Sequence, residues 1–90
     1  MRVEWTRAAR VDRVEIYRHI EADNPRAAAD LDRRFDSTVG RLADFPHLGR
    51  LGRVPNTREL VAHRNYVIIY EIDGAVARIL RLLHVARQWP

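Results

Sequence analysis

The sequence predicts an α+β domain in which an N-terminal strand and an antiparallel two-helix hairpin accompany a small antiparallel sheet, in the order β-α-α-β-β-β. Three observations lead to this prediction. Apolar residues recur at helical spacing through the first half of the chain, whereas residues 58–85 form short segments rich in β-branched and aromatic residues. A chain of 90 residues, 47% of them hydrophobic, is long enough for one domain with one modest core.

The first strand and the first helix are predicted from residues 2 to 23. Arg2-Val3-Glu4-Trp5 alternates as a strand does, and we expect it to pair at the edge of the later strands. Thr6 is a suitable N-cap for a helix that ends near Asp23. Its apolar arc also contains Arg13, whose aliphatic stem can cover the core edge while its guanidinium reaches water. The apolar members of this arc are Ala9, Ile16, Tyr17 and Ile20.

A second helix is predicted from Pro25 to about Asp44. Asn24 can cap it and Pro25 suits its first position, while Phe45-Pro46 ends it. Because almost no loop separates the helices, they must form an antiparallel hairpin. One stripe should face the sheet, with Asp32, Arg33 and Asp36 pointing away and Asp30 paired to Arg34. The stripe consists of Leu31, Phe35, Thr38, Val39 and Leu42.

The remaining residues predict an irregular loop followed by a three-stranded meander. Residues 46–57 contain two Gly and two Pro and lack the spacing of a phosphate-binding loop. The strands are expected at 58–63, 66–72 and 76–85. Asp73-Gly74 predicts a two-residue type I′ turn between the last two.

The distribution of charge favours an anionic partner. All sixteen cations are arginine, which codon bias alone would explain. Residues 1–45 carry nine Arg against nine acidic residues, whereas residues 46–90 carry seven against three. The excess therefore belongs to the meander and its leading loop, as expected for binding nucleic acid or an acidic protein segment. Solvated charge without a partner is the alternative.

The composition limits the classes of chemistry open to this chain. The absence of cysteine excludes disulfides and thiolate metal sites and suits a reducing cytoplasm. No apolar run approaches the length of a membrane span, and the N-terminus lacks the apolar core of a signal peptide. The four histidines share no metal-ligand spacing, so we expect no metal and no cofactor.

Arg81 and His84 are the main candidates for chemistry on the last strand. Period two places Arg78, Leu80, Leu82 and His84 on one face, and Ile79, Arg81, Leu83, Val85 and Arg87 on the other. Arg81 therefore has apolar neighbours and needs a partner, either Glu71 or Glu59 across the sheet or an anionic ligand. His84 could act as a general acid or base, or could be a hydrogen-bonded histidine at the core margin.

Blocks along nearly the whole chain resemble the RelE/ParE toxin superfamily. They comprise Thr6 to Ile20, Asn24-Pro25-Arg26-Ala27-Ala28, Phe45-Pro46-His47-Leu48-Gly49-Arg50, Thr57-Arg58-Glu59-Leu60, Tyr66 to Ile72 and Ile79-Leu80-Arg81-Leu82-Leu83-His84. The resemblance implies the toxin of a bacterial type II toxin–antitoxin pair. It also implies hetero-oligomerisation with an antitoxin whose C-terminal segment wraps the toxin.

The two branches of this superfamily imply different targets. RelE-like toxins cut mRNA on the ribosome and carry an arginine after the first tyrosine of the central strand, where this chain has Val67. They also place two basic residues two apart on the preceding strand, where this chain has Arg58 and Leu60. The Arg-Leu-Leu-His ending resembles ParE-like toxins instead, which inhibit DNA gyrase by binding. Many of these extend a little beyond the position of Pro90.

The leading hypothesis is therefore a cytoplasmic ParE-like gyrase inhibitor neutralised by an antitoxin. The residues expected to bind target or antitoxin are Arg58, Arg64, Tyr66, Arg81, Arg87 and Trp89. The rival hypothesis is a ribosome-dependent mRNA endonuclease that uses Arg58, Arg81, His84 and Arg87. A third is an interaction domain that has lost toxicity.

Overall fold

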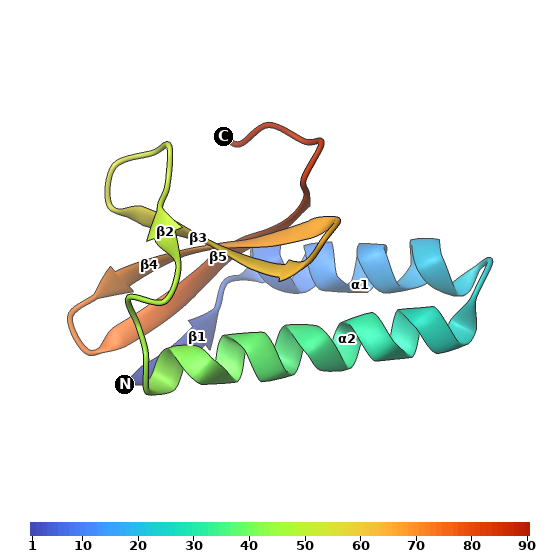
Figure 1. The fold of residues 1–90 in the computed structure, drawn as a ribbon, viewed down its shortest axis with the longest axis horizontal. Coiled ribbons are helices and arrows are strands. Elements are labelled where there is room, and N and C mark those ends of the chain that lie inside the picture. The colour runs from blue at the N-terminus through green and yellow to red at the C-terminus, as the bar shows by residue number, and fades with distance from the viewer.

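The computed structural model describes residues 1–90 as two helices packed on one face of a five-stranded sheet (Figure 1). The predicted α+β class and the hairpin-on-sheet arrangement are confirmed. None of the helices combines the length and apolar character needed to cross a bilayer. In chain order the elements are β1 (Arg2–Trp5), α1 (Arg7–Glu21), α2 (Pro25–Gly40), the 3₁₀ turn η1 (Arg41–Ala43), β2 (Arg50–Leu51), β3 (Thr57–His63), β4 (Tyr66–Asp73) and β5 (Val76–His84).

The strands lie in the order β1-β5-β4-β3-β2. The predicted meander forms the antiparallel centre, and β1 pairs at its edge as expected, but parallel to β5. The sheet is therefore mixed rather than wholly antiparallel. The prediction that residues 46–57 form only an irregular loop is wrong, because Arg50 and Leu51 pair with Glu59 and Arg58 as β2. Two residues are too few to show a strand periodicity.

Both helices begin where the capping residues predict. The Thr6 hydroxyl accepts a hydrogen bond from the Ala9 amide at 3.1 Å, and the Asn24 side chain accepts one from the Ala27 amide at 3.0 Å. Each bond satisfies an amide that the first helical turn leaves without a partner. Because only residues 22–24 connect the helices, α1 and α2 lie antiparallel, as Figure 1 shows.

Ion pairs between the helices differ from those predicted. The Arg13 guanidinium is only partly exposed, because it donates to Asp32 at 2.7 Å and to Asp36 at 2.9 Å across the hairpin. These two carboxylates therefore face α1 rather than pointing away, and the hydrogen bond from Arg13 lowers the pKa of Asp36. Asp30 pairs with Arg33, not with Arg34.

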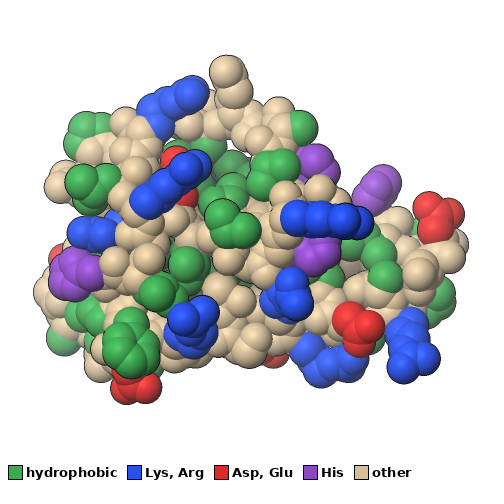
Figure 2. Space-filling model, viewed as in Figure 1, with side chains coloured by type: hydrophobic (Ala, Val, Ile, Leu, Met, Phe, Trp, Pro, Cys, Tyr) green, Lys and Arg blue, Asp and Glu red, His purple; other side chains and the backbone are tan.

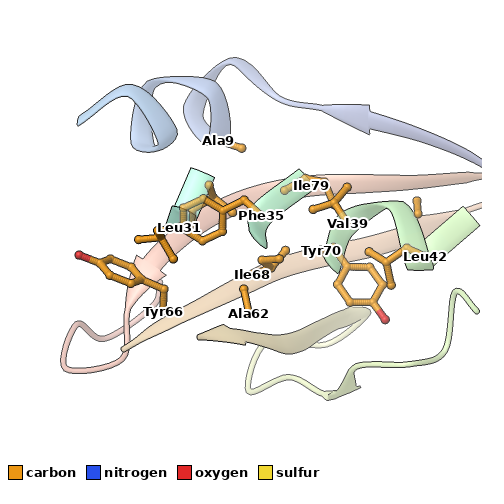
Figure 3. Close-up of a cluster of buried hydrophobic side chains, with 12 residues drawn as sticks. Ala9, Leu31, Phe35, Val39, Leu42, Ala62, Tyr66, Ile68, Tyr70 and Ile79 are labelled. Carbon is orange, nitrogen blue, oxygen red and sulfur yellow. The ribbon is translucent and has the colours of Figure 1, made fainter. Parts of the chain in front are cut away.

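The core lies between the helix hairpin and the sheet (Figure 3). Every residue of the predicted α2 stripe is buried, including Phe35 at its centre. The Phe35 ring meets the Tyr66 ring edge-on, with centroids 6.0 Å apart, and such aromatic pairs add to the gain from burial. On the sheet, alternate residues of β4 face the helices, namely Tyr66, Ile68 and Tyr70.

Two local features of β4 and β5 differ from the sequence prediction. The connecting turn is Gly74-Ala75, with positive φ (59°) only at Gly74, which fits a type II′ turn better than type I′ at Asp73-Gly74. A register shift in β5 breaks its period, since Tyr70 pairs with Ile79 but Ile69 pairs with Arg81. Ile79 and Leu82 therefore share the helix-facing core, which regular alternation would forbid.

Asp12 supplies hydrogen-bond acceptors along the part of the β5 edge that does not pair with β1. β1 pairs with β5 only as far as Ile79, after which α1 begins. The Asp12 carboxylate then accepts hydrogen bonds from Arg81 at 2.7 and 2.9 Å and from the Leu82 amide at 3.0 Å. The predicted cross-strand partners of Arg81, Glu59 and Glu71, bind Arg50 and Arg78 instead. Hydrogen bonding to Asp12 raises the pKa of Arg81.

A candidate binding cleft on the open face of the sheet

The face of the sheet opposite the helices carries a cleft of about 240 Å³. Its floor is a row of apolar side chains from three strands, Val61, Val67, Ile69 and Leu83. Ile69 and Leu83 are each only 2% exposed although no helix covers them. They are shielded because the C-terminal tail and the segment around β2 both rise on this side of the sheet (Figure 1).

The rim of the cleft is basic. Arg50 pairs with Glu59 at 3.0 Å on one side, so these two charges offset each other. Arg53 and Arg87 also line the cleft and take part in no ion pair. Trp89 adds a partly buried aromatic surface at the tail. Figure 2 shows arginines over the β2 segment beside a hollow lined with hydrophobic side chains. The cleft thus combines an apolar floor with unpaired positive charge.

His84 shapes the tail wall of the cleft. Its Nδ1 atom accepts a hydrogen bond from the Ala86 amide at 3.1 Å, and its carbonyl accepts one from the Arg87 amide at 2.9 Å. The ring also packs against Tyr66, with centroids 5.3 Å apart. His84 therefore turns the chain out of β5, which matches the hydrogen-bonded alternative for this residue.

A hydrogen-bonded loop flanks the cleft. The buried Tyr70 hydroxyl donates to the Pro46 carbonyl at 2.7 Å and accepts from the Gly49 amide at 2.9 Å. Burial raises the pKa of Tyr70, so the phenol stays protonated and able to donate. Arg58 donates to the carbonyls of Gly49 at 2.8 Å and His47 at 3.5 Å. Residues 46–49 are thereby fixed against β3 and β4.

Replacing Tyr70 with phenylalanine is expected to lower the free energy of unfolding by about 1–3 kcal/mol, because a buried donor and acceptor lose their partner. Urea denaturation followed by circular dichroism measures the change. Tyr17→Phe is the matched control, since the Tyr17 hydroxyl makes no hydrogen bond within the chain. Equal midpoints for Tyr70→Phe and the unaltered protein would show that this hydroxyl does not stabilise the loop.

The structure brings together only some of the residues that the sequence singled out. Arg87 and Trp89 line the cleft. Arg58 is bound to the 46–49 loop, and Arg81 is bound to Asp12. The remaining two lie apart: Tyr66 is in the helix-facing core, and Arg64 is exposed in the turn between β3 and β4.

Residues that the sequence prediction did not assign to a site complete the cleft. Arg53 was assigned only to the loop, and Val61 had no role. The sequence does contain a signal for the apolar floor of the cleft. It is the uninterrupted apolar run of β4, because such a run predicts a strand covered on both faces. Val67 and Ile69 belong to the second covered face. What covers it, however, depends on how the tail folds back.

The arrangement favours binding over acid–base chemistry. The only acidic group in the cleft is Glu59, which is paired, and no histidine lines it. His84 lies in a separate hollow of about 220 Å³ beside α1, together with Glu15, His19 and Arg87. Nowhere in the fold do three His, Asp or Glu side chains gather as a metal site requires.

A helical hairpin thus lies on one face of a small sheet, and a basic cleft with an apolar floor lies on the other. The family model described as the ParE toxin of the type II toxin–antitoxin system parDE matches residues 3–89. This chain belongs to that family.

Individual relatives agree with this family. The protein Y4kP of Sinorhizobium fredii is 43% identical, over 99% of this chain and 93% of its own length. Toxin RelE2 of Caulobacter vibrioides is 35% identical, over 94% of this chain and 96% of its own length. A solved structure of the chromosomal ParDE toxin–antitoxin system from P. aeruginosa has a TM-score of 0.85 and 28% identity, covering 94% of this chain and 96% of that one.

Proposed function

We propose that this toxin inhibits DNA gyrase by binding in the cytoplasm, and that a cognate antitoxin neutralises it by occupying the open-face cleft. The observation that carries the proposal is the composition of the cleft. Cleavage of a phosphodiester needs groups that move a proton and stabilise developing negative charge at the same phosphate. Here the centre of the floor is Val67, Arg58 and Arg81 are held by other groups, and His84 lies outside the cleft.

Two of the candidate catalytic residues are held by contacts within the chain. Arg58 is engaged by backbone carbonyls, and Arg81 is held in a bidentate pair with Asp12. Leu60 occupies the second basic position of RelE-like toxins. It packs against the helix-facing core, so it does not face the cleft. A protein with this surface can recognise a macromolecule but offers little for cutting RNA. Membership of the ParE family supports the same interpretation.

The antitoxin proposal rests on complementarity. A cleft with apolar floor and two unpaired arginines, Arg53 and Arg87, suits a segment that places apolar side chains on Val61 and Val67 and carboxylates at the rim. Trp89 has the size and partial burial of a residue that contributes strongly to binding energy. The relative in the ParDE structure is part of a toxin–antitoxin system, which supports a partner of this kind.

Ribosome-dependent cleavage of mRNA is the second candidate function. One observation favours it, namely that His84 and Arg87 line the same hollow beside α1, where a base and a cation could meet one phosphate. The name of the relative RelE2 points to the same branch.

Plasmid supercoiling by purified gyrase separates these functions. We expect stoichiometric addition of the toxin to block ATP-dependent supercoiling, and addition of the cognate antitoxin to restore it. In a parallel translation reaction, mRNA analysed by primer extension should remain uncut. Unimpaired supercoiling together with cuts at codon spacing in the translated mRNA would replace the gyrase proposal with the endonuclease.

A further inference from the structure

Exposed apolar side chains that do not line the cleft concentrate on one segment. Eight large hydrophobic residues of this chain are exposed, and three of them lie within residues 45–51. Phe45 is 62% exposed, Leu51 is 75% exposed, and Leu48 lies between them. Met1, also exposed, is tied to the same corner because its amino group donates to the Ala43 carbonyl at 3.1 Å. Scattered single residues need no explanation, but such a concentration does.

The segment is held rigidly. Tyr70 and Arg58 bind the backbone of residues 46–49 through the hydrogen bonds described above. Gly49 has no room for a side chain, since a Cβ there would lie 2.8 Å from the Tyr70 ring and 2.9 Å from the Glu59 carbonyl oxygen. Leu51 is held on β3 because it pairs with Arg58 as part of β2. Buried hydrogen bonds therefore hold in place a loop whose large apolar side chains are exposed to solvent.

Rigid display of apolar side chains is a property of binding surfaces. Binding to a preformed loop costs less conformational entropy than binding to a loop that becomes ordered only in the complex. Phenylalanine and leucine can enter an apolar pocket. Arg50 is paired with Glu59, and among the other charges near this segment in the sequence exposed Arg41 and Arg53 outnumber Asp44. Hydrophobic side chains and arginines both lie at the surface on the left of the face drawn in Figure 2.

We propose that Phe45, Leu48 and Leu51 form the surface with which the toxin docks on its protein target. The partner that fits is a protein surface with an apolar pocket bordered by Asp and Glu. This inference rests on the proposed function, which makes gyrase that target. It also provides a route for neutralisation, because Arg50 and Arg53 line the cleft and flank Leu51 in the chain, so that an antitoxin seated in the cleft would hinder docking.

The test is the double variant Phe45→Ser/Leu51→Ser in the gyrase supercoiling assay. Since both side chains are exposed, the variant should melt within a few degrees of the unaltered protein. We expect its half-inhibitory concentration to rise at least about tenfold, as loss of central apolar contacts does at protein interfaces. The control is Val11→Ser/Val14→Ser, which removes two apolar side chains of α1 that are 44% and 47% exposed and should leave inhibition unchanged.

A second measurement separates the surface from the cleft. Calorimetric titration of the same variants with the cognate antitoxin should give affinities within about threefold of the unaltered toxin. Full inhibition of gyrase by Phe45→Ser/Leu51→Ser would overturn the inference while leaving the proposed function intact. Failure of the unaltered toxin to inhibit gyrase would remove both. Concentration-dependent dimerisation in sedimentation velocity, abolished by the variant, would reassign the surface to a second copy of this chain.

Discussion

Replacing Asp12 with alanine is expected to lower the free energy of unfolding by about 3 kcal/mol, because it leaves both the Arg81 guanidinium and the Leu82 amide without a partner. The Asp12 side chain is only 8% exposed and that of Arg81 only 27%, so water can replace little of what is lost. Denaturant titration of the purified variant measures the change.

The magnitude follows from the type of interaction. Asp12 forms two hydrogen bonds to one guanidinium and a third to a backbone amide, all at 2.7–3.0 Å. Removing one partner of a buried ion pair costs more than the pair contributes, since the remaining charge is left desolvated. Asp12→Asn keeps one acceptor oxygen but replaces the other with an NH2 donor and loses the charge, so its destabilisation should lie between those of alanine and the unaltered protein.

Glu15→Ala is the matched control on the same helix. Glu15 is exposed and makes no ion pair, so its replacement should change stability by no more than about 0.5 kcal/mol. If Asp12→Ala proved as stable as Glu15→Ala, the carboxylate would not hold the free edge of β5.

Reversing the charge of the cleft while removing its tryptophan should give the largest change in antitoxin binding. For Arg53→Glu/Arg87→Glu/Trp89→Ala we expect the dissociation constant to rise at least about 100-fold, since an aromatic contact and two complementary charges are lost together. Surface plasmon resonance with the immobilised cognate antitoxin measures it. Because charge steers association, the variant should also lose most of the salt dependence of its association rate.

A control with the same change in net charge identifies the site. Arg26→Glu/Arg34→Glu alters two exposed arginines of α2, on the opposite side of the sheet from the cleft. Its affinity for the antitoxin should stay within about threefold of the unaltered toxin. Equal weakening by both variants would mean that the antitoxin responds to overall charge rather than to the cleft.

The sequence predicted most of the fold because its signals are local. Asn24-Pro25 fixes the start of α2, and Phe35 lies at the centre of an apolar stripe that any helix would present to a core. The continuous run of β4 indicated a strand regardless of its neighbours. For the same reason the two-residue β2 was missed, since it exists only through pairing with β3.

The site was predictable only in part because its contacts join distant segments. Asp12 and Arg81 lie 69 residues apart, and the sequence around each residue does not indicate the other as its partner. The one local hint was that Asp12 lies on the helix face of Ala9 and Ile16, where an unpaired carboxylate would be costly. Arg87 and Trp89, which the sequence predicted as binding residues, line the cleft, but Arg53 joins them only after the tail folds back.

The central claim is that this toxin acts by binding and that His84 is structural. The most direct test compares the unaltered toxin with His84→Ala, once each is shown by circular dichroism to be folded, in gyrase supercoiling and in translated-mRNA cleavage. We expect both proteins to inhibit supercoiling to within about threefold of each other and neither to cut mRNA. Cleavage by the unaltered toxin that disappears in folded His84→Ala would contradict it.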